Sequence, residues 1–365
     1  MLQRLAIGID IGGTKVKAGV VDEDGIVLEN TTRDTPSTDP RLVEDAIAEI
    51  VTDMRSRHYV VAVGIGAAGF VDSTRSTVLF APHLAWRNEP LRDAVRRRVG
   101  LSALIDNDAN CAAWAEWRFG AAQNESDLVC ITLGTGIGGG LVLGGQVHRG
   151  RNGIGGEFGH MQVVDGGHAC ECGNHGCWEQ YASANALVRE ARDLVKAGAP
   201  GVETLLDRAG GDPDAITGIL VSQVAVEGDP VATQLLADMG EWLGVGIANL
   251  AAALDPGTFV IGGGVSDAGD LLIRPATEAF RRTLTGRGFR PEPRIVRAHL
   301  GNQAGMIGAA DLARTTTRRG KRRSRSRSRR PPTGATFGRG LGLSRIESKT
   351  GSLRARGHGD DTTDR

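Results

Sequence analysis

The amino-acid sequence predicts an α/β fold. A chain of 365 residues is long enough to bury a sizeable core and to form two moderate domains. Its composition, 40% hydrophobic with 53 glycines and few aromatic residues, is typical of an α/β protein rich in turns. Strand-like apolar runs alternate with segments of helical spacing, and several runs end in glycine-rich turns. Ligands of open α/β sheets bind at such strand ends.

Composition also excludes some classes of protein. The longest apolar runs have the length of strands, so no membrane span is expected. The N-terminus lacks the regions of a secretory peptide. The five cysteines are odd in number and clustered, which favours metal ligation in a reducing cytosol over a disulfide framework. We therefore expect a cytoplasmic protein.

A glycine turn separates the first two predicted strands, residues 4–9 and 16–21. Gly12 and Gly13 permit a tight turn whose main-chain N–H groups can donate to phosphate oxygens. Side chains beside this turn add two donors and a carboxylate suited to Mg²⁺; they are Thr14, Lys15 and Asp10. A simple hairpin explains the same residues equally well. The turn is not a Walker loop, because no Gly-Lys-Ser/Thr opens a helix.

The next segments lead to a second candidate site. Their predicted order is strand 25–32, helix 41–57, strand 60–65, helix 91–99 and strand 103–105. Gly69 lies in a loop at the end of the third of these segments, where a ligand is expected. Asn107 and Asp108 follow the last strand and precede a helix. Capping of that helix is one interpretation. The other, which we favour, is a carboxylate that accepts a proton from a hydroxyl nucleophile.

The first motif is repeated further along the chain. A strand at 128–133 and a strand at 141–143 flank a glycine-rich turn with a threonine, whose candidate phosphate-binding residues are Gly134, Thr135, Gly136 and Gly138. The repetition suggests a duplicated fold that grips a nucleotide's phosphates from two sides. A third glycine turn follows strand 259–261 and suits an adenine and ribose lying against bare backbone; its residues are Gly262, Gly263 and Gly264.

The remaining segments are mostly helical. Helices are predicted at 184–196, at several stretches up to 254, at 271–284 and at 302–313, with a last strand at 294–298. From residue 314 to 365 the chain contains 16 Lys/Arg and 4 Asp/Glu, whereas the whole chain is neutral. Such a basic, Gly/Ser-rich tail is expected to be disordered. It lacks interleaved aromatic residues, so nucleic-acid binding is not expected to be its function.

A cluster of sulfur and imidazole groups predicts a zinc site. The ligand candidates have the spacing H-x9-C-x-C-x4-C and are His160, Cys170, Cys172 and Cys177. Four protein ligands close a tetrahedral shell, so the metal is expected to be structural. Free thiols are the alternative, and His168 and His175 are rival fourth ligands. The other two cysteines, Cys111 and Cys130, fit core positions.

Two carboxylates flank this cluster. Glu157 lies three positions before His160, and Glu179 lies two positions after Cys177. Held together by the metal, the two carboxylates and the imidazole are suitable acceptors for the vicinal hydroxyls of a sugar. Two surface glutamates are the alternative, which fits less well with the Gly155-Gly156 that precedes Glu157.

The combination of motifs strongly resembles the ROK (repressor, open reading frame, kinase) family over residues 4–313, and most of all its bacterial ATP-dependent glucokinases. The resemblance rests on residues 10–15, 133–139 and 156–160 and on the Cys-x-Cys-x4-Cys-x-Glu run. One departure is the sequence His83-Leu-Ala-Trp86, where related glucokinases usually have Asn-Leu-Pro-Trp.

The resemblance implies an actin-like ATPase (ribonuclease H-like) fold with two α/β domains around a cleft. The domains expected are 1–108 with helix 302–313, and 109–301 with the zinc loop 160–177, followed by the tail. By position, Asp108 matches the catalytic base and the glycine turns match the ATP-binding motifs. The sugar contacts matched are Asn107, Glu157, His160 and Glu179. A homodimer or homotetramer is also implied.

The activity implied is phosphoryl transfer from ATP to the 6-hydroxyl of D-glucose, with Mg²⁺ for catalysis and Zn²⁺ for structure. The nearest alternative is a kinase of the same family for fructose, N-acetylmannosamine or N-acetylglucosamine, or one that uses polyphosphate. A sugar-sensing repressor is the alternative of another class. Such repressors carry an N-terminal helix-turn-helix domain, and this chain begins only three residues before its first predicted strand.

Overall fold

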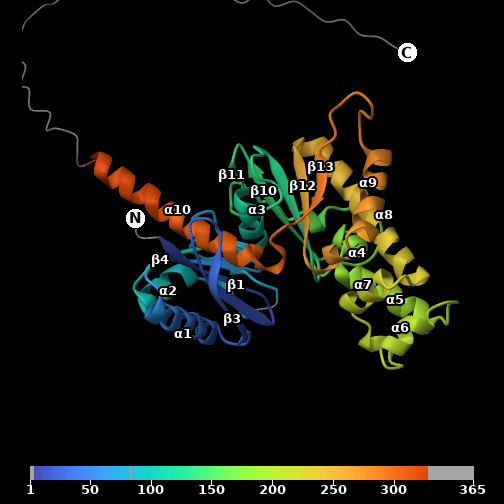
Figure 1. Ribbon diagram of the computed structural model, residues 1–365, viewed down its shortest axis with the longest axis horizontal. Helices are drawn as coiled ribbons and strands as arrows, with labels where there is room; N and C mark the ends of the chain where they lie inside the picture. The colour runs from blue at the N-terminus through green and yellow to red at the C-terminus, as the bar shows by residue number, and fades with distance from the viewer. Residues whose placement is uncertain (1–3, 83, 328–365) are drawn as a thin grey trace, which may run out of the picture. The chain divides into compact units, whose positions relative to one another are not determined.

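Two five-stranded sheets form the framework of the chain (Figure 1). The computed structural model describes residues 4–82 and 84–327. His83, one of the residues that depart from the family pattern, lies outside this part of the chain. A third, three-stranded sheet is much smaller.

The first sheet has the strand order β3-β2-β1-β4-β8. The strands are β1 (Leu5–Ile11), β2 (Lys15–Val21), β3 (Val27–Asp34), β4 (Val60–Ala67) and β8 (Ser102–Asn107). Strands β1, β2 and β3 pair in antiparallel fashion, whereas β4 is parallel to both β1 and β8. The carboxyl ends of β1, β4 and β8 therefore meet at one edge of the sheet.

The second sheet repeats this arrangement, with the order β11-β10-β9-β12-β13. Its strands are β9 (Leu128–Leu133), β10 (Ile137–Leu143), β11 (Gln146–Val147), β12 (Thr258–Gly262) and β13 (Arg294–Arg297). Again three strands pair antiparallel, and β12 is parallel to β9 and β13. The glycine turns β1–β2 and β9–β10 occupy corresponding places, which agrees with the duplication predicted from the sequence.

Helices cover both faces of the first sheet. Apolar side chains of α1 (Pro40–Arg57) and α2 (Leu91–Val99) pack on one face. Helix α10 (Ala304–Arg327) lies on the other face (Figure 1). A methyl group on Gly8 would lie 1.9 Å from the carbonyl oxygen of Met306, so only glycine allows this helix to approach β1 so closely.

The second sheet is covered in the same way. Helix α3 (Asp108–Phe119) packs on β10, where a Cβ at Gly140 would lie 2.4 Å from the carbonyl oxygen of Ala109. On the opposite face lie α8 (Pro230–Leu254) and α9 (Asp270–Thr283), whose apolar residues share a core with β9 and β12. Each sheet is thus buried on both faces, as parallel strands require.

Shorter elements complete the fold. The small sheet contains β5 (Phe70–Val71), β6 (Val78–Phe80) and β7 (Arg87–Glu89). Four helices lie between β11 and α8: α4 (Glu179–Ala182), α5 (Ala184–Lys196), α6 (Glu203–Arg208) and α7 (Gly218–Val226). Two 3₁₀ helices used below are η1 (Phe158–His160) and η3 (Gly264–Ala268).

The last helix extends beyond the predicted position. The described residues up to Arg322 form one compact unit. Helix α10 continues past Ala313, where the sequence placed the start of a disordered tail. Arg314 explains part of the difference, because its guanidinium is buried, pairs with Asp311 and donates to the carbonyl oxygen of Val21 at 3.2 Å. Residues 328–365 of the predicted tail lie outside the described part of the chain, and the proposed domain boundaries remain a prediction.

No helix in the described part of the chain is both long and apolar enough to cross a membrane.

Candidate active site

Two carboxyl groups come together where β1 and β8 end. Asp10 is the penultimate residue of β1, and Asp108 begins α3 directly after β8. Between them, on β4, lies Gly66; a Cβ there would be 3.5 Å from Cα of Asp108 and 3.7 Å from Oδ1 of Asp10. The glycine therefore leaves the space in which both carboxyl groups lie.

These carboxyl groups have perturbed pKa values. Burial, and secondarily repulsion from the nearby carboxylates of Asp10 and Glu157, raises the pKa of Asp108 to about 7. Burial likewise raises the pKa of Asp10 to about 6, and the ammonium group of Lys17 opposes the increase. A carboxyl that titrates near neutrality is suited to proton transfer at that pH.

Asn107 has the capping role that was one of the two interpretations. Its side-chain oxygen accepts a hydrogen bond from the backbone N–H of Asn110 at 3.0 Å, so it caps α3. Its amide nitrogen donates to the carbonyl oxygen of Gly69 at 3.3 Å. The helix cap is thus linked to the loop of Gly69, where a ligand was expected.

A short helical turn presents the next predicted residues. Glu157 precedes η1, and His160 ends it. Glu157 keeps exposed surface, yet desolvation by the surrounding protein raises its pKa, and repulsion from Glu179 acts in the same direction. Both observations fit a side chain in a concave wall. Because Glu157 also affects the titration of Asp108, the two carboxyl groups share one electrostatic environment.

Glu179 connects this wall to the second glycine turn. It begins α4, and its Oε1 lies 3.4 Å from Nδ1 of His160. Its Oε2 accepts from the backbone N–H of Ile137 at 3.4 Å. A Cβ at Gly136 would lie 2.3 Å from the same oxygen, so a larger residue there would displace the Glu179 carboxylate. The structure therefore brings together Glu157, His160 and Glu179, as the sequence predicted.

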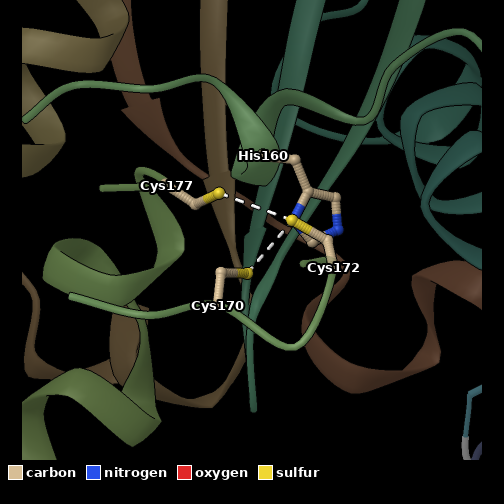
Figure 2. A group of neighbouring side chains, drawn as sticks. All are labelled: His160, Cys170, Cys172 and Cys177. Atoms are coloured by element: carbon tan, nitrogen blue, oxygen red, sulfur yellow. Dashed lines mark hydrogen bonds between the residues drawn. The ribbon is translucent and has the colours of Figure 1, made fainter. Parts of the chain in front are cut away.

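The four predicted zinc ligands converge (Figure 2). Their ligand atoms all lie within 4.8 Å of one another. The sulfurs of Cys172 and Cys177 are 3.6 Å apart, and Cys170 Sγ is 3.7 Å from Nδ1 of His160. Among the described residues, the histidine of this group is His160, so the rivals His168 and His175 are not favoured.

The geometry of this cluster fits zinc. A zinc–sulfur distance of about 2.3 Å places tetrahedral ligands roughly 3.8 Å apart, close to the two separations found. Three thiols and one imidazole are also a donor set typical of structural zinc. Cys111 and Cys130 are buried elsewhere in the fold, as predicted for core residues.

The two strand-connecting turns present exposed backbone. Gly12 N–H is occupied by the carbonyl oxygen of Lys15 at 3.0 Å, and Lys15 itself pairs with Asp34 on an exposed part of the sheet. In the second turn Gly134 and Thr135 are exposed, and a Cβ at Gly134 would meet no atom within 4 Å. This turn therefore has room for an incoming group.

Gly138 has a packing role. The sequence placed it in a turn, but the turn ends at Gly136 and residue 138 belongs to β10. A Cβ there would lie 2.5 Å from Oγ1 of Thr132 and 3.2 Å from Cβ of Ala109. Close packing of β9, β10 and α3 accounts for this glycine without a ligand.

The third glycine turn borders a cleft of about 750 Å³. Gly263 has φ +89° and Gly264 begins η3, so both expose backbone to the cleft. Apolar and polar side chains of α7, among them Ile219, Ser222 and Val226, form the opposite side. Gly262 ends β12, below this surface, and is buried. The size and lining suit a planar ring system.

Sequence reasoning missed two residues beside the carboxyl pair. Lys17 lies opposite Asp10 in the β1–β2 register, and only the hairpin pairing places it there. Asp106 is buried and forms an ion pair with Arg149. Its position next to Asn107 could have suggested a role for Asp106. Its partner Arg149 lies 43 residues away, and no local sequence pattern indicates the pairing.

Comparison with known proteins gives consistent results. The model of the ROK family matches residues 6–316. A glucokinase of Streptomyces coelicolor is 49% identical over 310 residues, which cover 85% of this chain and 98% of that protein. The crystal structure of a ROK family glucokinase from Streptomyces griseus, in complex with glucose and AMPPNP, is 50% identical, with a TM-score of 0.80 over 85% of this chain and 99% of that chain. This likeness confirms the predicted fold class.

Repressors are related as well. A putative xylose repressor of a Caldicellulosiruptor species is 37% identical over 241 residues, which cover 66% of this chain and 58% of that protein.

Proposed function

The chain belongs to the ROK family, and we propose on that basis that it is an ATP-dependent glucokinase. It transfers the terminal phosphoryl group of ATP to the 6-hydroxyl of D-glucose and yields ADP and glucose 6-phosphate. The observation that carries this assignment is the likeness, over nearly the whole of both folded chains, to glucokinases including one solved with glucose and AMPPNP.

We propose that the sugar lies against two walls. One consists of Asn107 and Asp108 at the start of α3, and the other of Glu157, His160 and Glu179 beside the zinc cluster. Carboxylate oxygens accept hydrogen bonds from vicinal hydroxyls, and an imidazole nitrogen accepts or donates one. His160 directs Nδ1 to the cysteines, so its Nε2 remains for a hydroxyl.

Asp108 is the proposed general base. In its ionised form it accepts the proton of the 6-hydroxyl as that oxygen attacks the terminal phosphorus of ATP, and the bond to the bridging oxygen of ADP breaks. Its pKa of about 7 makes it both substantially ionised and a competent proton acceptor near neutral pH. Positioning of the two substrates supplies the rest of the rate enhancement.

We propose that the nucleotide extends from the cleft beside Gly263 and Gly264 to the second glycine turn. The cleft has the size and the apolar side of an adenine site, and the exposed turn at Gly134 and Thr135 has space for phosphate oxygens, although the N–H of Gly134 donates to the carbonyl oxygen of Gly136 at 3.0 Å. The first turn, with Gly12, Gly13 and Thr14, is the corresponding element of the other sheet. Lys15 is already paired with Asp34, which weakens its proposed phosphate contact.

We propose that the enzyme binds two kinds of metal ion, Mg²⁺ and Zn²⁺. Asp10, close to a second carboxyl group, offers the oxygen donors that Mg²⁺ prefers. When bound, Mg²⁺ neutralises phosphate charge. Zn²⁺ is the proposed occupant of the site formed by His160, Cys170, Cys172 and Cys177, where it stabilises the loop. A cytoplasmic location and assembly as a homodimer or homotetramer remain predictions.

Two alternative functions predict different results in an activity assay. A kinase for another hexose shares the same base and walls, and differs in sugar preference. A sugar-sensing regulator of the family is the second alternative, favoured by the similarity to a putative xylose repressor.

A coupled assay of ADP release, with a panel of hexoses and with ATP or polyphosphate as donor, separates these functions. The proposal predicts that glucose with ATP gives the highest kcat/KM. Preferential turnover of fructose, N-acetylmannosamine or N-acetylglucosamine would support the first alternative, and sugar binding without turnover would support the second.

A further inference from the structure

One ion pair joins the two walls of the proposed sugar site. Asp106 ends the apolar part of β8, and its side chain is 2% exposed. Both of its carboxylate oxygens lie 3.0 Å from Nε of Arg149, and Nη2 of the same guanidinium donates to Oδ2. Such a forked contact fixes direction as well as distance between the two side chains.

The carboxylate of Asp106 is also tied to the start of α3. Its Oδ1 accepts from the backbone N–H of Asn107 at 3.1 Å and from the amide of Asn110 at 3.3 Å. Arg75 lies farther away, 3.9 Å from Oδ2. Asp106 therefore holds the backbone that immediately precedes Asp108.

Arg149 is tied to the opposite wall. Its Nη1 donates to the carbonyl oxygen of Val147 at 3.0 Å, at the end of β11. Its own carbonyl oxygen accepts from the backbone N–H of Gly155 at 2.9 Å. This bond closes the loop that continues directly into Gly156 and Glu157. The side chain of Arg149 is only 18% exposed, so water competes little for its hydrogen bonds.

We propose that Arg149 is a positioning residue: through Asp106 it sets the separation between the proposed base Asp108 and the Glu157 wall. This inference rests on the proposed function. Arg149 and Asp106 touch no reacting atom. Their pair instead joins two chain segments whose spacing decides whether the 6-hydroxyl and the base are aligned, and a misplacement of about 1 Å can reduce turnover about hundredfold.

The test compares Arg149→Met with Arg98→Met. Methionine keeps much of the length of the side chain and removes its charge and its fork. Arg98 provides the matched control because it forms an ion pair at 2.5 Å with the buried Glu44, between α2 and α1 and away from the site. Measurements are kcat, KM for glucose, KM for ATP and the midpoint of thermal unfolding.

For Arg149→Met we expect kcat to fall about hundredfold while KM for ATP changes by less than about threefold. Arg98→Met should lower the unfolding midpoint without changing kcat of the folded enzyme. Asp106→Asn should lower kcat about as much as Arg149→Met does. The double variant should have a kcat only slightly below that of either single variant, because both substitutions remove the same ion pair. Arg149→Lys keeps the positive charge but cannot form the forked contact, so its kcat should fall about tenfold. This variant replaces Arg149→Met in the test if Arg149→Met does not fold.

Normal kcat in folded Arg149→Met or Arg149→Lys would overturn the inference and leave the glucokinase proposal intact. Equal decreases in kcat for the Arg149 and Arg98 variants would also overturn the inference, since they would indicate a general effect of lost stability. If the wild-type chain phosphorylated no sugar, the proposed function would fail first, and this inference with it.

Discussion

At the scale of residues, Asp108 is distinguished by its surroundings. It begins a helix at the end of a parallel strand, in a region shared with Asp10 and Glu157. Burial and two like charges disfavour its ionised form, and each raises its pKa. An ordinary surface aspartate would be fully ionised at neutral pH but would be a weaker base.

This environment predicts the pH dependence of the reaction. The ionised form of Asp108 is the active one, so kcat/KM for glucose should rise with pH and level off above a midpoint near 7. The measurement is a pH profile of kcat/KM between pH 5 and 9, with unfolding monitored at each pH. An acidic limb centred near pH 4, the value of an ordinary aspartate, would contradict this role for burial.

At the scale of elements, the segment from η1 to α4 combines the proposed zinc site with the proposed sugar wall. The cluster places His160 beside three cysteines, and Glu179 lies 3.4 Å from the same imidazole. A long loop with little regular structure depends on such a link for its order. Removal of the metal should therefore affect the sugar wall more than the nucleotide cleft.

Cys177→Ser tests this dependence. We expect zinc content to fall below one ion per chain and KM for glucose to rise about tenfold or more, while KM for ATP changes little. Metal analysis of the purified protein and steady-state kinetics are the measurements. His175→Asn is the matched control, since His175 is exposed in the same loop and should leave zinc and kinetics unchanged. A zinc-free Cys177→Ser enzyme with normal KM for glucose would refute the link.

The nucleotide cleft allows a similar test at η3. A Cβ at Gly264 meets no atom within 4 Å, and the residue lines the cleft. Gly264→Leu should therefore fold normally but fill part of the adenine site, raising KM for ATP about tenfold and leaving KM for glucose unchanged. Gly264→Ala should have a smaller effect on the same constant. Unchanged ATP kinetics in the leucine variant would mean that adenine binds elsewhere.

At the scale of the whole molecule, much was predictable from local patterns. The two strand–turn–strand motifs predicted a duplication, and the two sheets indeed share strand order and direction. Cysteine spacing predicted the metal cluster, because its ligands lie within one short segment. Such features depend on residues that are close together in the sequence.

Contacts between distant segments were not predictable in this way. The Asp106–Arg149 pair depends on how strands and loops are placed in three dimensions. Gly138 was predicted to contact the nucleotide because its motif is rich in glycine, and the structure adds a packing role against Thr132 that the sequence did not indicate. The extension of α10 depends on the buried contacts of Arg314, which a basic tail composition conceals.

The most direct test of the central claim is the rate of glucose 6-phosphate formation from ATP and glucose by the wild-type chain and by Asp108→Asn at pH 8. Asparagine keeps the size of the side chain and removes the proton acceptor, so glucose binding, measured by calorimetry, should remain within about threefold. The account predicts robust turnover by the wild-type enzyme and a loss of about 10²–10⁴-fold in the variant. Comparable turnover by the two proteins, with both folded and binding glucose, would contradict it.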